Sequence, residues 1–257
     1  MKGTPDIMIS IKENERIDAT GFGDIKIIQD PEEFCYGVDS VILSDFAVRR
    51  AKNIREGSRI MDLGTGSGII PLILSYKTKA SFIRGVEIQE SSWDRASRSI
   101  ELNGLGDRLE FILTDILYVT KDMPEIKGSF DIVTSNPPYM PGSGGMKPET
   151  SAKTIARHET TAGLEDFIRV GSELLKERGE MFMVHRPSRL VDIFCLARKY
   201  RLEPKAVRMV LPRMGEEANI ALIHMIKSGR PELSVLPPLI IHEKDGGFTK
   251  ELEEAYI

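Results

Sequence analysis

Short apolar runs alternate with longer apolar stretches of helical spacing along most of the chain. The short runs end in glycine or polar residues, as buried strands do, and the longer stretches gather their apolar residues on one helical face. The predicted strands span residues 58–63, 81–88, 109–113, 130–135, 179–185, 206–211 and 218–226. The predicted helices span residues 41–48, 69–76, 91–102, 164–176 and 190–200. Because strands and helices alternate, the sequence predicts an α/β fold with a doubly wound, mostly parallel sheet of seven strands.

The two ends of the chain depart from this alternation. Residues 1–30 alternate weakly around a glycine-containing turn at residues 21–24, which predicts a short N-terminal β-hairpin. The last two predicted strands follow each other without a helix between them, so we expect them to pair antiparallel. The tail around residues 237–241 is expected to pack onto the domain as an edge segment. We therefore expect an extension over residues 1–50 and a main unit over residues 51–257, which together form effectively one domain.

The fourth predicted strand runs directly into Asn136, Pro137, Pro138 and Tyr139. Neither proline can donate a hydrogen bond to a sheet, and Pro137 keeps Asn136 out of helical geometry. The result is a stiff turn that suits a planar substrate with an amino group. The Asn136 oxygen and a backbone carbonyl of Asn136 or Pro137 can accept its two hydrogens, while Tyr139 stacks on its face. The tetrapeptide alone does not establish a substrate site, because the two prolines can simply end a strand and the tyrosine can simply pack in the core.

A glycine-rich turn joins the first predicted strand to the helix that follows it. Gly64, Gly66 and Gly68 let a ligand approach backbone N–H groups at the start of that helix. The dinucleotide-binding pattern is not met, because the third glycine comes one residue early. Asp62 would repel a pyrophosphate, whereas it suits a zwitterionic ligand such as the amino-acid end of S-adenosylmethionine. A nicotinamide dehydrogenase is therefore disfavoured.

Two further acids follow the ends of predicted strands. Glu87 lies 23 residues beyond Gly64, close to the spacing of about 20 residues at which a carboxylate reaches ribose hydroxyls. Asp115 closes the third strand, where it can accept a hydrogen bond from the exocyclic amine of an adenine. Either acid can also be an ordinary solvated residue at a turn. Because the carboxyl ends of parallel strands meet at one edge of a sheet, we expect these acids, the glycine turn and Asn136 to share one crevice.

The overall composition adds little to this prediction, but the distribution of charge along the chain indicates an additional binding partner. Hydrophobic content of 41%, charged content of 29% and a net charge of −4 fit a soluble globular protein without a basic surface overall. Residues 185–213 nevertheless contain eight basic residues against two acidic ones, and we interpret them as candidate phosphate contacts of an RNA. They are Arg186, Arg189, Arg198, Lys199, Arg201, Lys205, Arg208 and Arg213.

Several other classes of protein are disfavoured. Cys35 and Cys195 lie far apart without metal-type spacing, which indicates a reducing environment, and we expect a cytoplasmic protein. No signal peptide and no membrane span is expected from the sequence. Arg157, His158 and Glu159 suggest acid–base chemistry or half a metal site, but no second histidine follows at the spacing of a metal motif. No metal is therefore expected, and the role of these three residues stays open.

Residues 58–140 resemble class I S-adenosylmethionine-dependent methyltransferases. Asp62-Leu-Gly-Thr-Gly-Ser-Gly68 resembles their first motif, and Asn136-Pro-Pro-Tyr139 resembles the signature of members that methylate amino nitrogens of adenine, cytosine, guanine or glutamine. The resemblance implies a Rossmann-like fold, S-adenosylmethionine as the cofactor, and Asn136, Pro137, Pro138 and Tyr139 as catalytic residues. The cofactor-binding residues that it implies are Tyr36, Asp39, Asp62, Gly64, Thr65, Gly66, Gly68, Glu87, Ile88, Asp115, Ile116 and Asn136.

A narrower resemblance extends over nearly the whole chain. Residues 34–40, 156–159, 184–187 and 237–240 are similar to segments of the bacterial enzymes that methylate N6 of the adenosine 3′ of the anticodon in valine tRNA. The implied partner is a tRNA anticodon stem-loop. The glutamine methyltransferases of release factors share Asn-Pro-Pro-Tyr and are the alternative, although the Arg-Pro-Glu-Thr-Glu stretch that they usually carry upstream does not occur here. A scaffold that binds S-adenosylmethionine and RNA without catalysis would not need the intact tetrapeptide.

Overall fold

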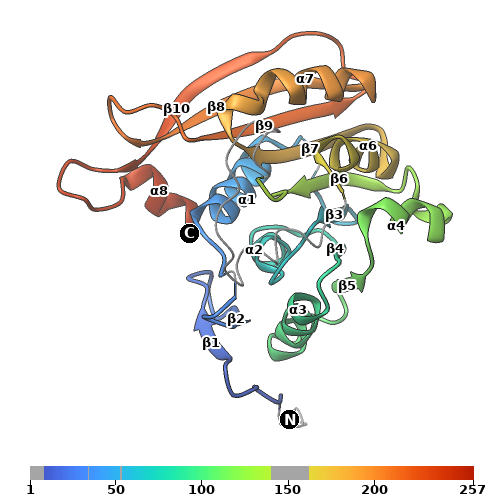
Figure 1. The fold of residues 1–257 in the computed structure, drawn as a ribbon, viewed down its shortest axis with the longest axis vertical. Coiled ribbons are helices and arrows are strands. Elements are labelled where there is room, and N and C mark those ends of the chain that lie inside the picture. The colour runs from blue at the N-terminus through green and yellow to red at the C-terminus, as the bar shows by residue number, and fades with distance from the viewer. Residues whose placement is uncertain (1–8, 34, 53, 140–161) are drawn as a thin grey trace, which may run out of the picture.

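The computed structural model describes residues 9–33, 35–52, 54–139 and 162–257, in which strands and helices alternate. The strands are β1 (Arg16–Ala19), β2 (Lys26–Gln29), β3 (Arg59–Leu63), β4 (Phe82–Glu87), β5 (Leu109–Leu113), β6 (Phe130–Ser135), β7 (Leu175–His185), β8 (Leu202–Arg213), β9 (Ile220–Lys227) and β10 (Ser234–His242). The helices are α1 (Val38–Arg50), α2 (Ile69–Lys77), α3 (Glu90–Leu102), α4 (Ile116–Asp122), α6 (Leu164–Leu174), α7 (Leu190–Lys199) and α8 (Lys250–Ala255). The expected N-terminal hairpin is confirmed, because β1 and β2 pair antiparallel before the main sheet begins (Figure 1).

One sheet in the order β10-β8-β9-β7-β6-β3-β4-β5 forms the centre of the molecule (Figure 1). All neighbours in it pair in parallel except β9, which is antiparallel to β7 and to β8. The mostly parallel sheet and the antiparallel pairing of its last two predicted strands are therefore confirmed. All its strands but β9 end at the same edge, which we call the C-terminal edge.

The sheet has eight strands, so the expected number of seven is wrong. The additional strand is β10, which comes from the tail of the chain and pairs in parallel with β8 at the outer edge. Its register shifts between Leu236 and Leu239, where Pro237 and Pro238 interrupt the strand. Two adjacent prolines argue against a strand in a sequence, but an outer edge accepts them because one side of the strand needs no hydrogen bonds.

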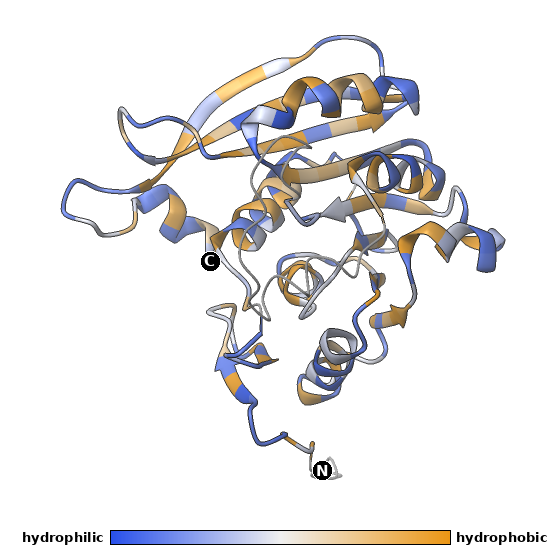
Figure 2. Cartoon of the chain, viewed as in Figure 1, coloured by the Kyte–Doolittle hydropathy of each residue, from blue (hydrophilic) through white to orange (hydrophobic). Residues whose placement is uncertain are grey.

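The sheet separates two apolar layers. Side chains alternate along each strand, so that Phe182 and Val184 of β7 face one layer while Met181 and Met183 face the other. Helices α1, α2 and α3 cover the first face, and α4, α6 and α7 cover the second (Figure 1). Figure 2 shows the corresponding pattern, with hydrophobic central strands and hydrophilic connecting loops.

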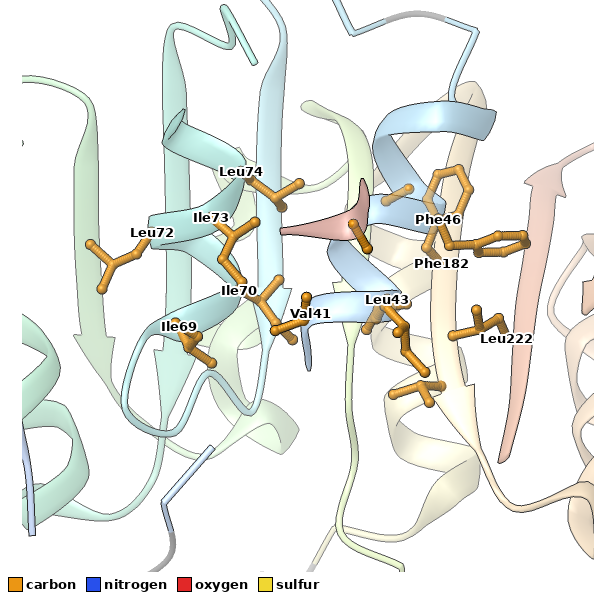
Figure 3. Packing of buried hydrophobic residues seen from close by; sticks show 14 of the residues in the cluster. Val41, Leu43, Phe46, Ile69, Ile70, Leu72, Ile73, Leu74, Phe182 and Leu222 are labelled. Carbon is orange, nitrogen blue, oxygen red and sulfur yellow. The ribbon is translucent and has the colours of Figure 1, made fainter. Parts of the chain in front are cut away.

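Helix α1 is fixed in the first of these layers. Val41 and Leu43 are fully buried, and Val41 lies beside Ile70 of α2 (Figure 3). Phe46 packs edge-on against Phe182 of β7, with ring centroids 5.9 Å apart. The neighbouring helix α2 has apolar residues around nearly its whole circumference, as is expected of a helix that is buried on nearly all sides. The division of the chain at residue 50 stays a prediction, although α1 shares its core with the main sheet.

We expect Leu43→Ala to destabilise the protein by about 2–5 kcal/mol, because it removes a fully buried side chain and leaves a cavity. Val191→Ala is the matched control, since its side chain is 74% exposed on α7 and such truncations change stability by less than about 0.5 kcal/mol. Urea denaturation measures both. Equal losses in the two variants would contradict the assignment of α1 to the core.

Candidate active site

The C-terminal edge carries the residues that the sequence analysis singled out. The order β6-β3-β4-β5 makes four successive loops neighbours. Asn136 follows β6, Gly64 follows β3, Glu87 ends β4, and Asp115 lies two residues beyond β5. The structure therefore brings the predicted features to one edge of the sheet, the edge at which open α/β sheets bind ligands.

The glycine turn is built from backbone hydrogen bonds. The N–H groups of Gly64 and Thr65 both donate to Val86 O, at 3.0 and 2.9 Å, which ties the turn to β4. Gly68 lies just before α2 with φ of 82°, and a Cβ there would lie 2.7 Å from the Phe111 ring. At Gly66, by contrast, an added Cβ would have no described atom within 4 Å. The turn thus packs tightly at its end and leaves space above Gly66, as the approach of a ligand requires.

Glu87 holds the turn in place from β4. One of its carboxylate oxygens accepts from Gly66 N at 2.8 Å, and the other accepts from Ile88 N and Gln89 N at 2.9 and 2.8 Å. Burial raises the pKa of Glu87, while these backbone donors act in the opposite direction. An ionised carboxylate has further lone pairs, so Glu87 can accept from ribose hydroxyls in the position that it already occupies.

Asp62 lies fully buried beneath the turn. Its Oδ1 accepts from Thr134 Oγ1 at 2.7 Å, and the Thr65 hydroxyl also acts on this carboxylate, although Asp62 Oδ2 and Thr65 Oγ1 make no hydrogen bond of good geometry among the described residues. Burial raises the pKa of Asp62 to about 6 despite the bond from Thr134. A buried polar atom without a good hydrogen bond lowers the stability of the protein. A ligand with an ammonium group and a carboxylate would supply hydrogen-bond partners in this region. The residues present therefore fit S-adenosylmethionine.

Four more of the predicted cofactor-binding residues come from three segments: the start of α4, the residue after β4 and the loop before α1. Asp115 precedes α4 and its Oδ1 accepts from Leu117 N at 2.9 Å, so part of this carboxylate stabilises the helix start. Ile116 is buried, and Ile88 is half-buried beside Glu87. Tyr36 is also half-buried, with a pKa that burial raises, and its N–H donates to Gln29 Oε1 at 3.1 Å. Contact of these residues with the cofactor stays a prediction.

The Asn-Pro-Pro-Tyr segment contacts the first turn of α1. The Tyr139 hydroxyl donates to Asp39 Oδ2 at 2.9 Å, and Asn136 Nδ2 donates to Ser40 Oγ at 3.4 Å. Burial and the nearby carboxylate of Asp39 raise the pKa of Tyr139, which keeps the hydroxyl protonated. Asp39 was expected at the cofactor, and the contact that the structure shows for it is with Tyr139.

The last residue of β7, His185, and the residue after it, Arg186, complete the surroundings of Tyr139, and His185 was not among the predicted site residues. The His185 ring lies at 64° to the Tyr139 ring with centroids 5.2 Å apart, and the Arg186 guanidinium lies 4.7 Å from the Tyr139 centroid. His185 Nδ1 accepts from Arg186 N at 2.8 Å, and burial lowers its pKa to about 4. The neutral ring therefore carries its proton on Nε2. Its place at the carboxyl end of a predicted strand was the available signal.

The basic segment is divided between the two edges of the sheet. Arg186 and Arg189 follow β7 and Arg213 ends β8, so these three lie at the C-terminal edge. Arg198, Lys199 and Arg201 lie at the opposite edge, where they pair with Glu203, Glu165 and Glu177. Lys205 is near that edge, and Arg208 lies mid-strand and pairs with Glu251. The eight residues therefore do not line one edge.

Neither a metal cluster nor a membrane-spanning helix occurs in the part of the chain that the structure describes. No three His, Cys, Asp or Glu residues there are grouped as metal ligands. No helix there combines the length and the apolar character needed to cross a bilayer. Arg157, His158 and Glu159 lie outside the described residues.

Comparison with known proteins assigns the class of enzyme. Residues 25–192 match the model of the methyltransferase small domain, and the chain belongs to this family of S-adenosylmethionine-dependent methyltransferases. A tRNA1(Val) (adenine(37)-N6)-methyltransferase from Porphyromonas gingivalis is 31% identical to it over 84% of each chain. The resemblances drawn from the sequence are thereby confirmed.

Solved structures show the same fold. A predicted O-methyltransferase from Agrobacterium tumefaciens is 26% identical, with a TM-score of 0.67 over 85% of this chain and 95% of that chain. The 16S rRNA N2 G1207 methyltransferase of T. thermophilus, solved in complex with AdoMet and guanosine, is 18% identical, with a TM-score of 0.60 over 85% of this chain and 52% of its own. The Rossmann-like architecture is therefore confirmed.

We expect Asp62→Asn to stabilise the cofactor-free protein at pH 8 and to weaken S-adenosylmethionine binding. The raised pKa means that ionised Asp62 costs about 1–3 kcal/mol of stability above pH 6, and this cost fades as pH falls from about 6 towards 4 and the carboxyl group becomes protonated. Urea denaturation at pH 8 and pH 5 should show a stabilisation that is smaller at pH 5. If Asp62→Asn increased the stability equally at both pH values, the result would contradict a buried, ionised Asp62.

Proposed function

We propose that this protein transfers the methyl group of S-adenosylmethionine to N6 of adenosine 37 in valine tRNA. The observation that carries the proposal is the Asn136–Tyr139 turn, which lies at the end of β6 directly beside the glycine turn after β3. The curated relative from P. gingivalis, named for this reaction, supports the choice of acceptor. The proposed site residues are those that the sequence implied apart from Asp39, whose contact is with Tyr139, and Asn136 through Tyr139 form the reacting centre.

The amino group of adenine is a poor nucleophile because its lone pair is delocalised into the ring. The Asn136 oxygen and the Pro137 carbonyl would accept its two hydrogens and turn the lone pair toward the methyl group. The sulfonium of S-adenosylmethionine supplies an activated methyl group and a neutral leaving group. Transfer would form one bond from N6 to the methyl carbon, break the bond from that carbon to sulfur, and release the proton of N6 to solvent. The protein's contribution is alignment and exclusion of water.

The adenine must leave its stack to reach this turn, and an anticodon loop makes that inexpensive. Tyr139 would stack on the extruded base. Arg186, Arg189 and Arg213 lie at the same edge as Tyr139, so we assign the phosphate contacts to them rather than to the residues at the opposite edge. We also propose a cytoplasmic location, which the two free thiols of Cys35 and Cys195 support.

The direct test of the reaction uses radiolabelled S-adenosylmethionine and bulk tRNA from a strain that lacks the gene. The RNA is digested, and its nucleosides are separated against standards. Label in N6-methyladenosine is the expected result. Label in a release-factor fraction instead would move the acceptor to glutamine, the alternative that the comparisons do not favour, and would overturn the proposal.

Asn136→Ala should lower the rate of methyl transfer at least about a hundredfold, because the hydrogen bond that orients the amino group is lost. S-adenosylmethionine affinity should change by less than about threefold in equilibrium binding, since the contacts of the glycine turn and Glu87 remain. Asn14→Ala, a change at an exposed turn, is the control. An equal loss of transfer and of cofactor binding would contradict the role of Asn136.

The double variant Arg189→Gln, Arg213→Gln should weaken tRNA binding about tenfold and reduce its dependence on salt concentration, because two phosphate contacts are lost. The matched control is Arg198→Gln, Lys199→Gln, which removes the same charge from the opposite edge. Filter binding over a range of salt concentrations measures both. Equal weakening by the two double variants would contradict the assignment of the RNA to the C-terminal edge.

A further inference from the structure

The first turn of α1 and the Asn-Pro-Pro-Tyr turn are distant in the chain but make two side-chain hydrogen bonds. Asp39 and Tyr139 are 100 positions apart, and Ser40 and Asn136 are 96 apart. Consecutive residues of one helical turn thus bind the two polar side chains of the tetrapeptide.

Neither Asp39 nor Ser40 caps α1 with its side chain. The helix begins after Gly37, and no side chain caps its first turn. An acidic residue in the first turn usually gains from the helix dipole and remains solvated. Asp39 instead is half-buried and accepts from Tyr139, while Ser40 is buried and its Oγ accepts from Asn136.

In the orientation that the structure shows, the Asn136 amide donates to the Ser40 hydroxyl through Nδ2. An amide has a donor end and an acceptor end. When Nδ2 donates to Ser40, Oδ1 is directed to the other side and is available to accept from the substrate amino group. The flipped amide would present N–H groups to a substrate that also donates, so it could not bind the amino group.

The bond to Asp39 fixes the Tyr139 ring at its tip. His185 and Arg186 contact its ring, and the hydroxyl adds a further point of attachment. A bond from a hydroxyl to an ionised carboxylate is stronger than one between neutral groups. Val41, Leu43 and Phe46 anchor α1 in the core. The two hydrogen bonds to α1 therefore hold the tetrapeptide in a fixed position relative to the core.

We propose that Asp39 and Ser40 are positioning residues that act through Tyr139 and Asn136, rather than cofactor ligands. Asp39 holds the ring on which the acceptor base stacks, and Ser40 supports the Asn136 amide through Nδ2, so that its oxygen stays available for the acceptor's amino group. The proposal rests on the proposed function, because it assigns these residues to the acceptor side of the same site.

The test is a double-mutant cycle between Asp39→Asn and Tyr139→Phe, with Asp45→Asn as the matched control. Asp45 is another carboxylate of α1, but it pairs with Arg49 and Lys77 and makes no contact with the tetrapeptide. Each single variant should lower kcat about tenfold, and the double variant should lose no more than either single variant. The affinity for S-adenosylmethionine should stay within about twofold of the wild type, and the control should retain full activity.

Ser40→Ala should likewise lower kcat, and Ser40→Thr should restore most of it because it keeps the hydroxyl. Additive losses in the cycle, or a large loss of cofactor affinity in Asp39→Asn, would overturn the proposal. The same cycle measured by urea denaturation without substrate reports the contact itself. If the wild-type protein leaves tRNA unmethylated while the stability cycle still shows coupling, the proposed function fails and the contact between α1 and the tetrapeptide stands.

Discussion

The common direction of the strands is the constraint on which the site depends. Strands β6, β3, β4 and β5 are hydrogen-bonded neighbours in parallel, so the loops that follow them must lie side by side. No single loop contains the site. The glycine turn is held by β4 through Val86 O and Glu87, and the tetrapeptide after β6 lies beside it. If one of these strands ran in the opposite direction, the loop after it would lie at the opposite edge. The parts of the site, such as the glycine turn and the tetrapeptide, would then be separated.

The same edge contains polar groups that the core would otherwise exclude. Asp62, Thr65, Glu87 and His185 are all buried, and unpartnered atoms remain on the first two. Burial raises the pKa of Asp62 to about 6 and lowers that of His185 to about 4, so both environments oppose charge. The apolar layers on both faces of the sheet supply the stability that allows this. These buried polar groups thus lower the stability of the protein at this edge. A ligand with its own ammonium, carboxylate and hydroxyl groups can supply hydrogen-bond partners for them.

Sequence alone predicted the parts of the site that follow strand ends. Apolar runs located β3, β4, β5 and β6, and the polar residues at or just beyond their ends identified Asp62, Glu87, Asp115 and Asn136 as candidates, since these signals are local. What depended on contacts between distant segments was not predictable. The bonds from α1 to Tyr139 and Asn136 join residues about a hundred positions apart. Likewise, the basic segment was continuous in sequence, yet β8 and α7 carry its members to different edges.

The most direct test of this account is a crystal structure with S-adenosylhomocysteine and an anticodon stem-loop that contains unmodified adenosine 37. The decisive measurement is the distance from adenine N6 to Asn136 Oδ1. We expect about 2.7–3.2 Å, with the base stacked on Tyr139 and N6 directed at the sulfur. An adenine bound elsewhere, or with its N1 edge rather than N6 against Asn136, would contradict the account.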